Sequence, residues 1–206
     1  MALFNIQKAG IEDMPRVAAV FLAAFPQTTA RLLRSPAALR GPEDLFSCLW
    51  QLEPGAFHLV QLGQQVAGYI ITPCDLTPLT AFVLRSGWGW RWVQGAFRGT
   101  YRLRWQGVFP TMLDQIIVTL KGRDPQHPGR ILSLAVHPCW QGKGLGRILL
   151  GAGLGYLKNQ GVRGVRLEVR EDNLPARTLY QGSGFCIKGE FRNTQGRWLI
   201  MNRSLG

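Results

Sequence analysis

The segment spanning residues 130–147 constrains the fold of this chain most, because it joins an apolar strand to a helix through a glycine-rich turn. Residues 130–136 are mostly aliphatic, and Pro138 ends the strand. Glycines recur at every second position of the turn, at Gly142, Gly144 and Gly146. Uncovered backbone N–H groups at such a turn, together with the positive end of the helix dipole, stabilise phosphate groups. The sequence therefore predicts a phosphate-binding turn.

Two common nucleotide motifs do not fit this turn. A Walker loop requires Ser or Thr directly after Gly-Lys, whereas Gly144 follows Lys143 here. The dinucleotide fingerprint G-x-G-x-x-G fails as well, because its last position falls on Arg147 or Leu149, depending on the starting glycine. The remaining pattern is Gln141-x-x-Gly144-x-Gly146. It resembles the acyl-CoA signature of the GCN5-related N-acetyltransferase (GNAT) family.

A second segment follows at the spacing that this resemblance requires. Residues 165–185 read as a strand, a short loop, a helix and a glycine stop. Alternation places Arg166, Glu168 and Arg170 on the strand face opposite to the apolar residues. The pattern L-E-V-R-x-x-N-x-x-A-x-x-L-Y-x-x-x-G-F is met in full by Leu167, Glu168, Val169, Arg170, Asn173, Ala176, Leu179, Tyr180, Gly184 and Phe185.

This version of the segment is most similar to ribosomal-protein alanine N-acetyltransferases and related N-terminal acetyltransferases. The resemblance implies that Glu168 is the general base, that Asn173 contacts the cofactor and that Tyr180 is the general acid. An ammonium nucleophile must lose a proton before it attacks a thioester, and the departing thiolate gains one, so a carboxylate and a phenol suit these roles. The alternatives are a solvated strand glutamate and a tyrosine that packs its ring in the core. Ser133 stands where histone-type relatives carry a catalytic glutamate, which favours Glu168 or a water chain as the base.

The resemblance also implies acetyl-CoA as the acyl donor. The acetyl-pantetheine arm is expected between two splayed strands, on backbone groups of Leu134, Ala135 and Val136. The residues implied at the turn are Gln141, Gly142, Lys143, Gly144, Leu145, Gly146 and Arg147, and those implied on the following helix and its cap are Asn173 and Tyr180. No metal site is expected, because no cysteine or histidine cluster has ligand spacing.

The expected fold class is α/β (α+β): a mixed, mostly antiparallel central sheet of six or seven strands flanked by helices, in a single domain over residues 1–206. Residues 73–129 form a helical insertion before the CoA-binding strand. Gly151, Gly153 and Gly155 predict close packing of the helix after the turn against the sheet. Outside the motif region, strands are expected at residues 4–8, 56–62, 65–72, 185–192 and 197–203, and helices at 11–25, 28–33, 42–52 and 111–120.

The chain is strongly basic, with 24 Lys and Arg against 12 Asp and Glu and a net charge of +12. Such a charge favours nucleic acid, ribosomes, anionic membranes or acidic substrates as partners. Arginines and aromatic residues are interleaved over residues 85–105, and no acidic residue lies between Asp75 and Asp114. This region is expected either to cover the sheet edge or a homodimer partner, or to contact an anionic surface, which would be RNA, the ribosome or a membrane.

A cytoplasmic location, either free or peripheral to the membrane, is expected from the cysteines and the apolar runs. The four cysteines are far apart and indicate no disulfide framework. The first residues lack the layout of a secretion signal, and no apolar run approaches 18 residues.

The expected function is direct transfer of an acetyl group from acetyl-CoA to a primary amine. The acceptor is either a protein N-terminus or a small molecule, and a polyamine fits poorly because like charges repel. The alternative from another class is a non-catalytic module that senses acyl-CoA or docks on RNA or membrane. A pure binder would need neither Glu168 nor Tyr180, so the presence of both argues for an enzyme.

Overall fold

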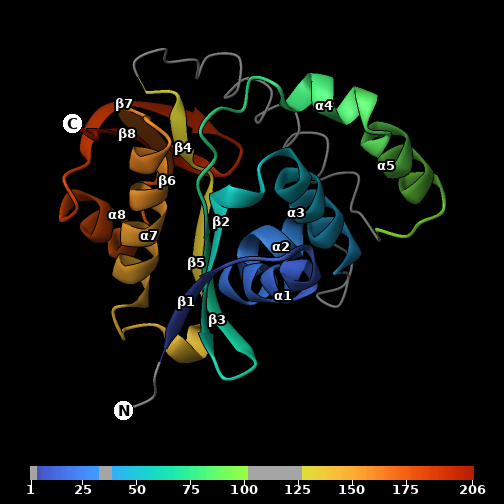
Figure 1. Cartoon of the computed structure of the whole chain (residues 1–206), viewed down its shortest axis with the longest axis horizontal. Helices are drawn as coiled ribbons and strands as arrows, with labels where there is room; N and C mark the ends of the chain where they lie inside the picture. The colour runs from blue at the N-terminus through green and yellow to red at the C-terminus, as the bar shows by residue number, and fades with distance from the viewer. Residues whose placement is uncertain (1–3, 33–38, 102–126) are drawn as a thin grey trace.

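The computed structural model describes residues 4–32, 39–101 and 127–206 (Figure 1). The helix expected at residues 111–120 and the basic and aromatic residues from 102 to 105 lie outside this part of the chain. The elements expected before and after the insertion are present, with ends shifted by one or two residues.

The first sheet consists of β1 (Asn5–Lys8), β2 (Phe57–Leu62), β3 (Gln65–Ile71) and β5 (Ser133–Val136), in that spatial order and with antiparallel pairing throughout. Gly63 has a φ of 57° in the tight connection between β2 and β3. The predicted central hairpin is therefore confirmed.

The second sheet has the order β4-β6-β8-β7, from β4 (Gly129–Ile131), β6 (Gly164–Arg170), β7 (Cys186–Asn193) and β8 (Gly196–Ser204). β4 and β6 are parallel, and the other two pairs are antiparallel. β4 and β5 are consecutive halves of the one strand expected at residues 130–136, separated at the exposed Leu132. Counted as one strand, they give the mixed, mostly antiparallel arrangement of seven strands within the expected fold class.

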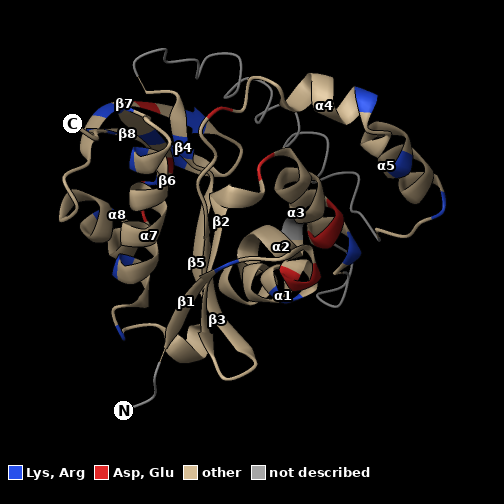
Figure 2. Cartoon of the chain, in the orientation of Figure 1, with Lys and Arg blue, Asp and Glu red and all other residues tan. Residues whose placement is uncertain are grey.

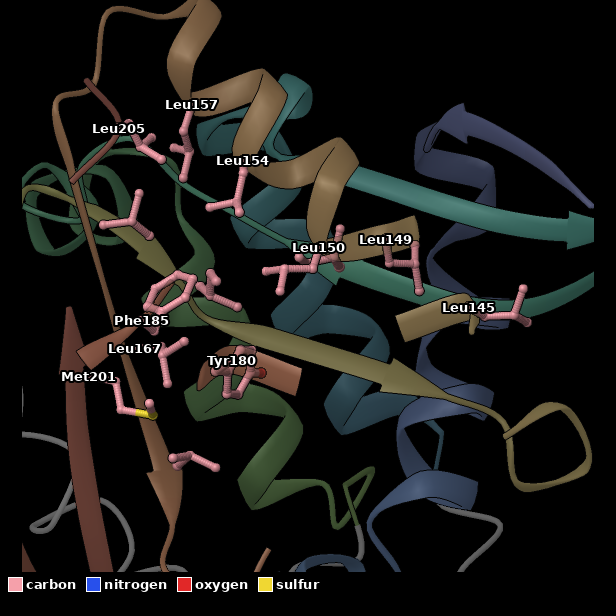
Figure 3. Packing of buried hydrophobic residues seen from close by; sticks show 14 of the residues in the cluster. Leu145, Leu149, Leu150, Leu154, Leu157, Leu167, Tyr180, Phe185, Met201 and Leu205 are labelled. Carbon is pink, nitrogen blue, oxygen red and sulfur yellow. The ribbon is translucent and has the colours of Figure 1, made fainter. Parts of the chain in front are cut away.

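Helices cover both faces of the strands (Figure 1). On one face lie η1 (Ile11–Asp13), α1 (Met14–Ala24), α2 (Pro26–Leu32), α3 (Arg40–Leu52) and η2 (Pro54–Ala56). On the other lie α7 (Leu145–Asn159) and α8 (Leu174–Gln181), with η3 (Pro138–Trp140) leading into the glycine turn. Each face has its own apolar core, one built on Phe57, Leu59 and Tyr69, and the other on the leucines of α7 (Figure 3).

Gly151, Gly153 and Gly155 of α7 have different surroundings, which corrects the expectation that all three pack closely against the sheet. A Cβ atom at Gly153 would lie 2.6 Å from Thr72 Cγ2 and 3.0 Å from Ile70 Cδ1, so this glycine lets the helix approach β3. No atom lies within 4 Å of a Cβ atom built at Gly151 or Gly155. Only Gly153 is therefore explained by helix-to-sheet packing.

The described part of the insertion is a pair of helices, α4 (Leu79–Arg85) and α5 (Trp88–Phe97). Two side chains of α5 contact α3, whereas residues 102–105 of the region expected to cover the sheet edge or a partner lie outside the described residues. Trp88 Nε1 donates a hydrogen bond to Gln51 Oε1 at 2.9 Å. Asp44 is 5% exposed and accepts hydrogen bonds from Arg91 at 2.9 Å and from the Tyr101 hydroxyl at 2.8 Å.

None of the described helices is long and apolar enough to cross a membrane.

Candidate active site

The two sheets separate where the expected strand divides. The β4–β6 ladder ends at the pair Ile131 and Leu167. Beyond this point, residues 168–170 of β6 pair with β8, whereas β5 pairs with β3. Within the described residues, the facing edges of β5 and β6 therefore carry no ladder between them, and backbone groups along them are left for another extended partner. Leu134, Ala135 and Val136, expected to bind the pantetheine arm, lie on the β5 edge.

The glycine turn lies between the end of β5 and the start of α7. Gly142 and Gly144 have φ values of 75° and 77°, in the left-handed region that favours glycine. No atom lies within 4 Å of a Cβ atom built at either residue, so the turn faces open space. Gly144 is the N-cap of α7 and provides no side-chain cap. The first N–H groups of α7 are therefore available to an anion.

Basic side chains flank the turn. Lys143 Nζ lies 4.5 Å from the centre of the Trp140 ring, a cation–π arrangement. Arg147 is exposed in the first turn of α7. Gln141 has another contact, because its Nε2 donates a hydrogen bond to the Val136 carbonyl at 3.0 Å. Gln141 thus connects the turn to the end of β5.

The two remaining turn residues pack inward. Leu145 is 1% exposed and belongs to the α7 core. A Cβ atom at Gly146 would lie 3.3 Å from Leu179 Cδ2, so Gly146 allows α7 and α8 to lie close together. The packing of these two residues thus fixes the turn against the α7 core and against α8.

Glu168 lies between two arginines on β6 and β4. Its carboxylate accepts hydrogen bonds from Arg166 Nε at 2.9 Å and from Arg130 Nη1 at 3.2 Å. All three side chains are largely buried, with exposed fractions of 16% for Glu168 and Arg130 and 10% for Arg166. The arrangement holds the carboxylate in one orientation.

Tyr180 lies in the core on the α7 side of the sheet, beside Phe185 and Leu167 (Figure 3). The centres of its ring and of the Phe185 ring are 5.8 Å apart. Burial raises the pKa of Tyr180 to about 12. No hydrogen bond reaches its hydroxyl from the described residues. Tyr180 is thus a protonated phenol at neutral pH with its donor capacity unused.

Asn173 is the N-cap of α8, where its side chain accepts a hydrogen bond from the Ala176 N–H at 3.2 Å. It is exposed, as expected of a residue that can also reach a ligand. The asparagine of the motif therefore also stabilises the start of α8 as its N-cap.

Two contacts were not predicted from the sequence. Arg130 on β4 reaches Glu168 on the neighbouring parallel strand β6. The other partner, Arg166, was expected near Glu168, because alternation places both side chains on the same face of β6. Ser133 shares a hydrogen bond of 2.8 Å with the buried hydroxyl of Tyr69 on β3. Both contacts join strands distant in sequence, so they depend on strand register.

A glycine turn at a helix start, beside two strand edges that diverge, defines the architecture of an acyl-CoA-dependent transferase. The chain belongs to the acetyltransferase (GNAT) family, whose profile matches residues 28–185. This match extends the resemblance found in the sequence motifs toward the N-terminus by more than one hundred residues.

Individual relatives agree with this family. The chain is 48% identical over 61 residues to a mycothiol acetyltransferase of Geodermatophilus obscurus, a match that covers 30% of this chain and 20% of the relative. The chain thus spans about one fifth of the length of that relative.

Solved structures resemble the whole fold. The ribosomal-protein-S18-alanine N-acetyltransferase from Escherichia coli superposes with a TM-score of 0.55 at 19% identity, over 99% of this chain and 95% of that one. The yncA protein from Salmonella typhimurium, solved with its cofactor acetyl-CoA, gives a TM-score of 0.60 at 16% identity, over 98% and 94%. These likenesses show the GNAT fold.

Proposed function

We propose that this protein transfers an acetyl group from acetyl-CoA to a primary amine, and that the amine is a protein N-terminus. The observation that carries the proposal is the open glycine turn beside the edge of β5 that pairs with no other described strand, with Glu168 on the opposite strand. The match of the motif segment to N-terminal acetyltransferases supports the choice of acceptor.

The turn and the β5 edge fit acetyl-CoA. The turn faces open space at Gly142 and Gly144, and its N–H groups would bind the pyrophosphate, with Lys143 and Arg147 adding positive charge. Leu134, Ala135 and Val136 would hydrogen-bond the pantetheine arm as an added strand would. Asn173 would contact the cofactor from the start of α8. When bound, acetyl-CoA supplies an activated acyl thioester.

Tyr180 is proposed as the general acid. Its pKa of about 12 keeps the phenol protonated at any physiological pH, so it can donate a hydrogen bond or a proton to a developing thiolate. The unused donor capacity of its hydroxyl supports this role. Its position in the core means that the ring is held by Phe185 and its neighbours before a ligand arrives.

Glu168 is proposed as the general base, acting directly or through a water. The two arginines orient the carboxylate through hydrogen bonds, so it is placed to accept a hydrogen bond from the ammonium group of an acceptor. The net charge of +12 on the chain disfavours polycationic acceptors.

The test follows free thiol release with acetyl-CoA and two panels of acceptors, N-terminal peptides and small amines. Peptide-dependent release is expected, and release with small amines alone would reject the N-terminal acceptor. Tyr180→Phe and Glu168→Gln are each expected to lower kcat about 100-fold or more, with acetyl-CoA binding retained. Full activity of either variant from neutral to alkaline pH would reject the role of that residue.

A small-molecule acceptor is the second candidate, and the match to a mycothiol acetyltransferase over 61 residues favours it. The two candidates differ in the expected KM: a peptide acceptor gains binding energy from residues beyond the amine, whereas a small acceptor does not. Lengthening the peptide should therefore lower the KM only under the first candidate. Binding of acetyl-CoA without release to any amine would instead support an acyl-CoA sensor.

A further inference from the structure

The outward side of α5 and the adjoining end of α4 expose large apolar side chains. The exposed fractions are 89% for Phe97, 76% for Leu84, 66% for Trp90 and 44% for Val93. Trp90, Val93 and Phe97 follow the spacing i, i+3 and i+7, so they lie on one side of the helix. We call these four residues the apolar face.

The opposite side of α5 is already occupied, so the helix cannot turn to bury the apolar face. Trp88 is 6% exposed and hydrogen-bonded to Gln51 of α3. A Cβ atom at Gly95 would lie 2.4 Å from Tyr101 Cε2, so no larger residue fits there. Arg91 pairs with the buried Asp44 and lies over the Trp88 ring at 4.8 Å. These contacts keep the apolar face directed away from α3.

The surroundings of the apolar face are cationic. Arg85 and Arg98 are exposed at the ends of the two helices. No acidic residue lies between Asp75 and Tyr101 in the sequence. Figure 2 accordingly shows only basic colouring on α4 and α5, at the periphery of the molecule. A partner for this face must therefore offer both an apolar layer and negative charge.

We propose that the apolar face docks the protein on an anionic lipid bilayer. Tryptophan and phenylalanine side chains insert at the boundary between headgroups and acyl chains, and arginines beside them pair with anionic headgroups. α5 has 10 residues and is about 15 Å long, half the thickness of the hydrocarbon layer, so it lies along the surface.

Charge and side-chain type distinguish this partner from two others. A two-fold contact between copies would bring the same arginines of both copies together, with no carboxylate on α4 or α5 to compensate. Single-stranded RNA would stack bases on Trp90 and Phe97 but would leave Leu84 and Val93 in water. A bilayer satisfies all four apolar side chains and both arginines.

The test measures co-sedimentation of the full chain with phosphatidylcholine vesicles, with and without phosphatidylserine. We expect binding to the anionic vesicles, with a blue shift of tryptophan fluorescence. A variant carrying Trp90→Ser, Val93→Ser and Phe97→Ser should lose this binding. Replacing Arg85 and Arg98 with glutamine should weaken it about 30-fold, at about a factor of five per charge.

Matched controls change the same residue types elsewhere on the surface. Ile187→Ser removes an exposed apolar side chain from β7, and Lys158→Gln with Arg192→Gln removes two exposed charges. These variants should bind vesicles as the unchanged protein does, and all variants should keep acetyl-CoA binding, which reports an intact fold. Acetyl-CoA binding is also a readout that does not depend on the docking surface.

Three results would overturn the proposal. The first is the absence of binding to anionic vesicles, or equal binding to neutral ones. The second is vesicle binding that survives the three serine substitutions. The third is a concentration-dependent dimer, seen by analytical ultracentrifugation, that those substitutions abolish, because the face would then be an interface between copies.

Discussion

At the scale of single residues, Tyr180 and Glu168 have opposite environments. Tyr180 is surrounded by apolar side chains, and burial raises its pKa, whereas Glu168 accepts hydrogen bonds from two guanidinium groups. Amine acetylation needs a proton acceptor for the amine and a proton donor for the departing thiolate, and an oriented carboxylate and a protonated phenol suit these two tasks. The proposed division of roles thus follows from the surroundings of each side chain.

The raised pKa of Tyr180 predicts an effect on stability at high pH. Burial raises this pKa from 10.0 to about 12, so between these values the folded chain holds the phenolic proton more tightly than the unfolded chain. This stabilisation is fully present below pH 10 and is lost as the pH rises toward 12. Tyr180→Phe should therefore reduce the fall in the free energy of unfolding over this range.

Urea denaturation across that range measures the effect, with the unchanged protein as the reference. Other buried tyrosines, such as Tyr69, still titrate in the variant, so a reduced slope and not a flat one is expected. An identical slope in both proteins would contradict the assigned environment of Tyr180.

At the scale of elements, α7 follows the glycine turn and packs on the sheet, and its glycines differ in what surrounds them. Gly153→Ala is expected to destabilise the fold by about 1–3 kcal/mol, because the added methyl group meets Thr72 at 2.6 Å. Gly151→Ala is the control on the same helix. It adds a methyl group in open space and should stabilise by about 0.5–1 kcal/mol. Thermal unfolding of both variants checks the prediction, and equal effects would contradict it.

The docking of α5 on α3 depends on Asp44. Asp44→Ala should lower the free energy of unfolding by about 1–3 kcal/mol, because it removes the carboxylate that accepts from Arg91 and leaves the Tyr101 hydroxyl only the longer contact of 3.5 Å to the Arg91 carbonyl. Amide hydrogen exchange should increase over Trp88–Phe97. Glu43→Ala, one residue earlier on α3, removes only a peripheral pair with Arg40 and should change stability by less than about 1 kcal/mol. Unchanged exchange over α5 in the Asp44 variant would argue against this anchor.

At the scale of the whole molecule, acetyl-CoA should stabilise the fold, because its proposed site spans the turn and both strand edges. A ligand at 100 times its Kd stabilises by about 2.7 kcal/mol, which raises Tm by about 5–10 °C for a chain of this size. Gly144→Ala places a side chain at a φ of 77° and should remove most of this shift. Gly63→Ala imposes similar strain at the distant β2–β3 turn, and its Tm should be lowered while the shift is kept. Equal shifts in both variants would contradict the turn as the phosphate site.

The sequence by itself determined the order of elements, the family and the position of the glycine turn. These features rest on local patterns: alternation along β6, glycines at a helix start and a motif within one stretch of chain. The strand predicted at residues 130–136 shows where such local patterns stop being informative. Its extent was predicted, but its division at Leu132 was not.

The tertiary structure decided which residues meet across the sheets. Arg130 reaches Glu168 through the parallel register of β4 and β6, and Tyr69 reaches Ser133 through the antiparallel register of β3 and β5. It also decided that, of Gly151, Gly153 and Gly155, only Gly153 approaches the sheet, and which side of α5 faces outward. The physical reason is that register and helix rotation are set by packing between distant segments, whereas local patterns report only the periodicity of each segment.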